Sequence, residues 1–179
     1  LHMLERFQLR KLEQAQRLHA RISRDYEELI PQELLYYPEK SVRWANTSYP
    51  KNEYPIPEDQ QHLTDKGDIV RSKLECMGLN CIYSMGLQFQ LEPAIRLKNG
   101  EIRYLDCQIL SPYTGRIIYI EFFGLMNNPD YVKRTIHKIN VYEDNGLVMG
   151  ENFLPVFEID GEPFDPRRFK RQLERLLRA

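Results

Sequence analysis

Residues 101–124 read Glu101-Ile-Arg-Tyr-Leu-Asp-Cys-Gln-Ile-Leu-Ser-Pro-Tyr-Thr-Gly-Arg-Ile-Ile-Tyr-Ile-Glu-Phe-Phe-Gly124, and this stretch decides the fold. Its two ends are rich in β-branched and aromatic residues, as strands are, and Ser-Pro-Tyr-Thr-Gly between them carries turn chemistry. If residues 112–115 form the loop, Ser111 pairs with Arg116, and counting outward sets Asp106 opposite Glu121. Directly opposed side chains share a face of the sheet, with Cα atoms about 4.5–5.5 Å apart.

Two carboxylates this close repel each other, so a strand pair kept for stability alone would avoid them. A divalent cation between them removes the repulsion, because Mg²⁺ and Mn²⁺ are bound by hard oxygen ligands. The sequence therefore predicts a metal site at Asp106 and Glu121. The alternative is that the register differs by a residue or two and that both acids point into water.

Bulk composition limits the classes of protein to consider. The chain has 179 residues, enough for one well-packed domain with an appendage. Its formal net charge of −1 gives no overall basic field, so any nucleic-acid surface must be local. Three cysteines (Cys76, Cys81 and Cys107) lack C-x-x-C spacing, which favours reduced thiols over a zinc site. Apolar runs are too short to span a bilayer, and we expect a cytoplasmic protein without a membrane partner.

The chain is expected to divide into three parts. Residues 1–35 form a helical arm, with one long helix over residues 4–29, through which the chain could dimerise or join a larger parent protein. Residues 36–66 are rich in Pro and Tyr without a clear period and predict an extended connector. Residues 67–179 form an α/β domain. The apolar stripe of the arm consists of Leu12, Ala15, His19, Ile22, Tyr26 and Leu29.

Periodicity within residues 67–179 predicts the element order α-β-β-β-α-β-α. Three strands in an antiparallel meander, followed by a helical crossover to a fourth strand, predict a mixed four-stranded sheet with helices on its faces. The expected elements are helix 68–83, strand 87–97, an Asn-Gly turn at 98–101, strands 101–110 and 116–124, helix 129–144 capped by Asn128, strand 154–159, and a helix that begins at Asp165-Pro166.

Four short motifs follow one another along this domain. They read Arg71-Ser-Lys-Leu-Glu75, Leu105-Asp-Cys107, Ile120-Glu-Phe-Phe-Gly124 and Lys138-Ile-Asn-Val-Tyr142. In this order they resemble a largely uncharacterised bacterial branch of the PD-(D/E)xK nuclease superfamily, over roughly residues 62–158. The resemblance implies a restriction-endonuclease-like three-layer sandwich. It also implies Mg²⁺- or Mn²⁺-dependent hydrolysis of phosphodiester bonds in nucleic acid, with DNA favoured over RNA and little intrinsic sequence specificity.

The resemblance also implies roles for particular residues. Asp106, Glu121, Glu75 and the backbone carbonyl of Phe122 would hold the metal. The superfamily lysine would stand two positions after Glu121, but Phe123 is there, and Lys138 on the following helix is the candidate replacement. From the residues alone, Glu75 could instead pair with Arg71 four positions earlier, and Lys138 could simply pack over a tyrosine.

Nucleic acid is the expected partner, and the candidate contacts are Arg71, Lys73, Gln108, Arg167, Arg168 and Arg171. The last helix carries six basic residues against one acid, Glu174, which suits a sequence-independent phosphate contact. A merely solvated basic face is the alternative. Two rival functions stay open: a catalytically inactive nuclease-like module that binds nucleic acid or a protein, and a purely structural oligomerisation domain.

Overall fold

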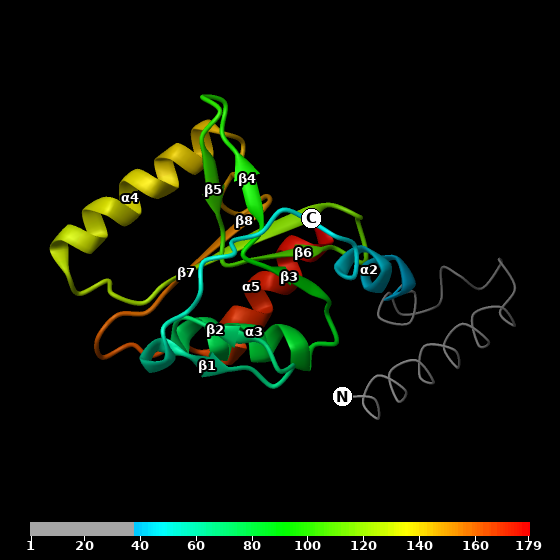
Figure 1. Ribbon diagram of the computed structural model, residues 1–179, viewed down its shortest axis with the longest axis horizontal. Coiled ribbons are helices and arrows are strands. Elements are labelled where there is room, and N and C mark those ends of the chain that lie inside the picture. Colours follow the sequence, from blue (N-terminus) through cyan, green and yellow to red (C-terminus); the bar gives the residue numbers. More distant parts are fainter. Residues whose placement is uncertain (1–37) are drawn as a thin grey trace, which may run out of the picture.

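A mixed four-stranded sheet organises residues 38–179, the part of the chain that this computed structural model describes (Figure 1). Its strands lie in the order β3 (Phe89–Leu91), β6 (Cys107–Leu110), β7 (Ile117–Phe123) and β8 (Phe153–Phe157). The first three pair antiparallel, whereas β8 runs parallel to β7 after a crossover through α4 (Pro129–Asp144). The predicted α/β class and mixed sheet are confirmed. The helical arm expected over residues 1–35 lies outside the described residues.

Helices cover both faces of this sheet. Alternate residues of β7 point to opposite faces, and Ile118, Ile120 and Phe122 pack against α3 (Lys73–Ser84) and α5 (Pro166–Arg178). Tyr119 and Phe123 pack on the other face, in the cluster that contains the buried residues of α4. Figure 1 shows α4 on one side of β7 and β8, with α3 and α5 on the other. None of the described helices is both long and apolar enough to cross a membrane.

Close packing of α3 on the sheet depends on a glycine. A Cβ placed on Gly78 would lie 2.2 Å from Cε1 of Phe122, so no larger residue fits between the helix and β7. The Phe122 ring also lies near that of Phe169 on α5, with centroids 6.2 Å apart. The side chain of Phe122 therefore packs next to both helices of this layer.

The helices begin close to where their capping residues predict. Asn128 accepts hydrogen bonds from the N–H groups of Asp130 and Tyr131 at the start of α4, and Asp165 accepts one from Arg167 at the start of α5. Helix α3 begins at Lys73 rather than at residue 68. Residues 69–70 instead form β2 (Ile69–Val70), which pairs with β1 (His62–Leu63).

Two strands expected to be continuous are each broken in the structure. The predicted strand 87–97 divides into β3 and β4 (Ala94–Arg96), and strand 101–110 divides into β5 (Ile102–Tyr104) and β6. The first break follows from Pro93, which has no N–H to donate, and from Glu92, whose φ is 45°. The outer halves pair as a separate ribbon around the predicted Asn99-Gly100 turn, with Gly100 at φ 88°.

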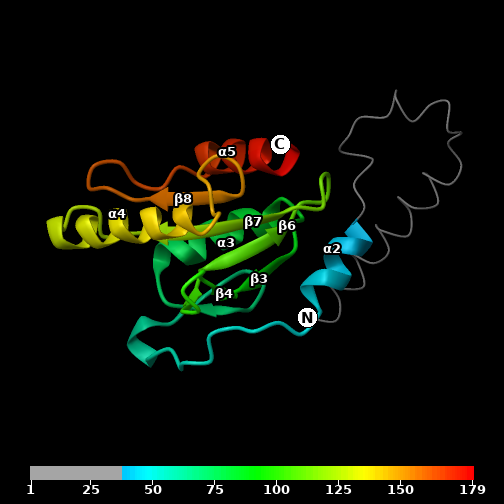
Figure 2. The same cartoon turned by 90° about the horizontal axis from the view of Figure 1, so that it is seen from above.

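The connector before the domain differs from the extended path predicted for residues 36–66. It contains α2 (Pro38–Ala45) and a short 3-10 helix, η3 (Glu58–Gln60). Between them it runs along the β3 side of the sheet (Figure 2). There the Tyr49 hydroxyl donates to the Leu91 carbonyl at 2.9 Å, and Asn52 N–H donates to the Glu92 carbonyl at 3.0 Å.

Candidate active site

Asp106 and Glu121 meet just before the start of β6, beside β7. The predicted register is confirmed by four pairs, from Leu110 with Ile117 to Cys107 with Ile120, and the next step of the same register sets Asp106 opposite Glu121. Strand β6 begins one residue after Asp106, so the ladder stops there. The Phe122 N–H donates instead to Oδ2 of Asp106 at 2.6 Å. The carboxylate thus takes the place of a ladder carbonyl and is held against β7.

Lys138 of α4 reaches this acid pair. Its Nζ donates to Oε1 of Glu121, whose side chain is 5% exposed, while that of Lys138 is 38% exposed. The ammonium also lies 5.8 Å from the ring centroid of Phe123 and 5.7 Å from that of Tyr142. The lysine therefore lies near a tyrosine, as one of its two predicted readings has it, and it also pairs with Glu121. Its role toward a water molecule or a phosphate stays a prediction.

Burial raises the pKa values of both acids, and neighbouring negative charge adds to the effect. The pKa of Asp106 lies well above its ordinary value, first because of burial and then because of the negative charges of Glu121 and Glu75. Burial also raises the pKa of Glu121, against the opposing effect of Lys138. Glu121 is buried and Asp106 is half-buried, and they share a single lysine. When both acids are ionised, the site has an excess of negative charge, which a cation would neutralise.

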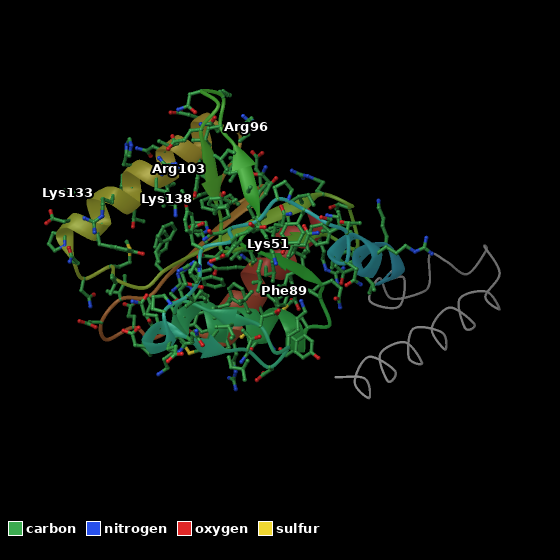
Figure 3. The ribbon with its side chains drawn as sticks, in the orientation of Figure 1. Lys51, Phe89, Arg96, Arg103, Lys133 and Lys138 are labelled. Carbon is green, nitrogen blue, oxygen red and sulfur yellow. The ribbon has the colours of Figure 1, made fainter. Side chains whose placement is uncertain are left out.

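Two buried oxygens at this site lack hydrogen-bond partners among the described residues. They are Oε2 of Glu121 and the hydroxyl of Tyr142. The Tyr142 pKa is raised by burial and by the charges of Glu121 and Asp106, and the nearby Arg103 of β5 lowers it (Figure 3). An unpaired buried oxygen costs about 1–3 kcal/mol. The site can therefore accept a further polar ligand. Its donor atoms are all oxygens, which are the ligands that Mg²⁺ and Mn²⁺ prefer.

The carbonyl of Phe122 faces the same region. In an antiparallel pair the N–H and C=O of one residue point to the same neighbouring strand. The Phe122 N–H binds Asp106, whereas the adjacent Phe123 carbonyl accepts from Glu158 on the β8 side. The Phe122 carbonyl therefore points toward Asp106, where the resemblance expects it.

Glu75 lies within electrostatic range of both acids but has local partners. Its Oε1 accepts from the Ser72 hydroxyl at 2.9 Å and its Oε2 from the Arg71 N–H at 3.2 Å, which caps the start of α3. The Arg71 guanidinium pairs with Glu92 at 3.1 Å rather than with Glu75. Across residues 38–179, no group of three or more His, Cys, Asp or Glu side chains could hold a metal ion. A cation here would need carbonyl, water or substrate oxygens as well, which is how Mg²⁺ is usually bound.

The remaining candidate residues are spread over the molecule. Gln108 donates to Oε1 of Gln90 at 2.6 Å, and Gln90 in turn donates to the Trp44 carbonyl at 2.9 Å, so this pair ties the connector to the sheet. Lys73 is exposed at the start of α3. The sheet separates the α5 layer from Glu121. The candidate contacts Arg167, Arg168 and Arg171 are exposed on α5.

Tyr131 and Tyr142 of α4 lie near the acid pair, although no role was predicted for them from the sequence. Tyr131 has its pKa raised by burial and by the charges of Asp106 and Glu121, as Tyr142 does. The available signal was their spacing, because Tyr131, Lys138 and Tyr142 share one side of the helix. That pattern also describes an ordinary buried stripe, so it does not single out a site.

Comparison of the chain with models of known protein families, with curated proteins and with solved structures gives no significant match.

Proposed function

We propose that this protein is a metal-dependent nuclease of the PD-(D/E)xK superfamily with a restriction-endonuclease-like fold, which hydrolyses phosphodiester bonds in nucleic acid. The observation that carries the proposal is the pairing of Asp106 with Glu121, two acids in opposed register beside a single lysine. The mixed sheet between two helical layers supports the same family.

Each residue has a defined task in this proposal. The carboxylates of Asp106 and Glu121, with the Phe122 carbonyl, would hold Mg²⁺ or Mn²⁺. When bound, the ion neutralises charge that develops on the phosphate and lowers the pKa of the attacking water. Glu75 adds negative charge nearby and would act through a water molecule, because both of its oxygens already accept hydrogen bonds.

Lys138 would replace the lysine that the superfamily places at position 123. Its ammonium lies over the ring of Phe123, on the same face of the sheet, so it occupies the neighbourhood of the missing side chain. From there it would orient the attacking water or contact a phosphate oxygen. A positive group in this place acts on charge that forms in the transition state.

The substrate we propose is DNA in preference to RNA, on the basis of the family resemblance, with little sequence specificity. Exposed Arg134 lies one helical turn before Lys138 on α4, and the two add local positive charge beside the site despite the net charge of −1. Such charges would bind the phosphate backbone without reading the bases.

Cleavage assays test the proposal directly. Plasmid, single-stranded DNA and RNA are incubated with the protein and Mn²⁺, and the Asp106→Asn variant should lower the rate by about 10³-fold or more. Lys138→Met should lower it by about 10²-fold. Lys133→Met on the same helix is the matched control and should change it far less. Cleavage that persists in Asp106→Asn would contradict the proposal.

A catalytically inactive nuclease-like module is the second candidate. It is favoured by one observation: Lys138 already neutralises Glu121, so the site can be satisfied without a cation. Calorimetry with Mn²⁺ separates the two candidates. The enzyme should bind the ion and lose this binding in Glu121→Gln, whereas the inactive module should bind none in either form.

A further inference from the structure

A second polar site lies at the turn between β6 and β7, at the opposite end of β7 from Glu121. It is a pocket of about 230 Å³ between this turn and α2, and Figures 1 and 2 both show α2 next to the turn. This volume is below the roughly 300–1,000 Å³ of sites for drug-sized ligands, so the pocket suits one small group. Its lining residues are Lys40, Ser41, Ser111, Pro112, Tyr113, Thr114 and Gly115.

The lining is rich in hydrogen-bond donors. Four of its seven residues carry a hydroxyl, one carries an ammonium group, and none carries a carboxylate. Ser41 is 2% exposed, and its Oγ has no hydrogen-bond partner in the described part of the chain. Lys40 Nζ lies 3.2 Å from the position that a Cβ would take on Gly115. Gly115 has φ 71°, so a larger residue would be strained there as well as crowded against the lysine.

The Ser111 hydroxyl stabilises the turn, whereas the hydroxyls of Ser41 and Thr114 can still donate to a ligand. The Ser111 hydroxyl donates to the Leu177 carbonyl at 2.5 Å and accepts from the N–H groups of Tyr113 and Thr114. Thr114 Oγ1 only accepts, from the Arg116 N–H at 3.4 Å, so its own O–H remains able to donate. Ser41, Thr114 and Lys40 thus present three donors around one small pocket.

Two arginines lie near this pocket, in addition to Lys40 in its lining. Arg178 of α5 lies 4.4 Å from the ring centroid of Tyr113, and exposed Arg116 directly follows the lining residues. A small pocket with hydroxyl donors, a lysine and no carboxylate matches the chemistry of a phosphate group, which offers several acceptor oxygens and negative charge. We infer that this pocket binds a phosphate group.

The position of the pocket indicates where the phosphate would come from. Gln108 and Glu121 point to the same face of the sheet, because Gln108 pairs with Tyr119, two residues before Glu121. Through Gln90, Gln108 is linked to the carbonyl of Trp44 in α2, so α2 lies toward the face that carries the acid pair. Arg116, the residue before β7, is five residue steps from Glu121 along the chain, about 17 Å at 3.3–3.4 Å per residue.

A nucleic-acid strand with its scissile phosphate at Asp106 and Glu121 would therefore place another phosphate, a few nucleotides away, at the pocket. This assignment of the source rests on the proposed function. The affinity for phosphate itself does not.

Phosphate binding is measured on the isotope-labelled full chain by nuclear magnetic resonance. Titration with inorganic phosphate should give saturable shifts of the Ser41, Thr114 and Gly115 amides, and Lys40→Gln should weaken the affinity by about tenfold or more. Lys51→Gln, an exposed lysine outside the lining, is the matched control. Ser41→Ala should also weaken binding while leaving thermal stability unchanged or higher, since the hydroxyl it removes has no partner. Shifts that are absent, or that are equal in wild type and Lys40→Gln, would overturn the inference.

A second arm identifies the source of the phosphate. In the Asp106→Asn background, which prevents cleavage, Lys40→Gln should weaken binding of a DNA oligonucleotide and reduce the slope of log affinity against log salt by about one. If oligonucleotide binding is unchanged while inorganic phosphate still saturates the pocket, the site stands as one for free phosphate. Because the amide shifts do not depend on catalysis, they distinguish failure of the pocket from failure of the nuclease proposal.

Discussion

The two faces of the sheet differ in what they bury. The face under α3 and α5 packs Ile118, Ile120 and Phe122 in a continuous apolar core. The face under α4 packs a smaller cluster around Phe123, which lies two residues after the buried Glu121. One strand, β7, supplies both sets from alternate positions. The contrast indicates that the apolar core under α3 and α5 contributes most of the stability. The face under α4 has fewer apolar contacts because it contains charged side chains.

The sharpest test of this division replaces Glu121 by Gln. We expect the cleavage rate to fall by about 10³-fold, because a cation ligand is lost. The free energy of unfolding should not fall, because a buried charge is removed and Lys138 is exposed enough to be hydrated. Cleavage assays and urea unfolding measure the two effects.

Glu143→Gln, at an exposed position of the same helix as Lys138, serves as the control. A loss of about 3–5 kcal/mol in stability for Glu121→Gln would show instead that the ion pair is a structural element of the α4 face.

On the apolar face, Leu173→Ala should destabilise the protein strongly. Leu173 is fully buried between α5 and the sheet, and truncation of such a leucine costs about 2–5 kcal/mol. Ile136→Ala on α4 is the comparison, because this side chain is 53% exposed and should cost little. Chemical unfolding of both variants measures the difference. Equal losses would mean that the burial of Leu173 under α5 does not stabilise the fold as described.

The acidic face should also make stability depend on pH. The pKa values of Asp106 and Glu121 are higher in the folded protein than in the unfolded chain. At pH values between the unfolded and the folded pKa, the folded protein therefore binds more protons. Stability should therefore fall as pH rises from the ordinary carboxyl range through the raised pKa of Asp106. Unfolding at a series of pH values with a chelator should show this fall in wild type, and a smaller one in Asp106→Asn.

Mn²⁺ should restore the free energy of unfolding at the high-pH end of this range, because both acids are ionised there and can bind the cation. At 100 times its dissociation constant a ligand stabilises the folded state by about 2.7 kcal/mol. Equal stabilisation of Asp106→Asn by Mn²⁺ would place the cation elsewhere.

The smallest effect is expected from Tyr142→Phe. Because the buried hydroxyl finds no partner among residues 38–179, its removal should leave the free energy of unfolding unchanged or raise it by up to about 1 kcal/mol. Thermal unfolding measures this, with Tyr119→Phe on the same face as the comparison. A clear loss of stability would indicate that the hydroxyl bonds to Glu121 in solution, and the acidic face would then be more tightly held than proposed.

Local sequence signals predicted the elements whose causes are local. The loop of residues 112–115 set the register of β6 and β7, because a one-residue slip would exchange the two faces of the strand. The capping residues Asn128 and Asp165 located the starts of α4 and α5. Lys138 could be predicted because the family resemblance requires a replacement lysine and because it lies beside Tyr131 and Tyr142 at the edge of the buried side of the helix.

Features that depend on distant partners were not predictable in this way. Arg71 binds Glu92, which is 21 residues away, rather than the adjacent Glu75. The breaks in the two long strands arise because the hairpin tip pairs with itself while the inner halves join the main sheet. Helix α2 has only eight residues, too few to show a reliable period, and its attachment to Gln90 is a tertiary contact.

The attachment of α4 at both ends has a consequence for how the lysine reaches the acids. At its C-terminal end, the hairpin tip binds the helix: the Lys98 N–H donates to Asn145 Oδ1 at 2.7 Å, and Lys98 Nζ donates to the Asp144 carbonyl. At the other end, only a short loop joins it to β7. The helix is therefore fixed at both ends. Binding of a ligand by Lys138 then costs little conformational entropy of the helix. Loosening the distant tip would then weaken binding at the acids without altering a single atom there.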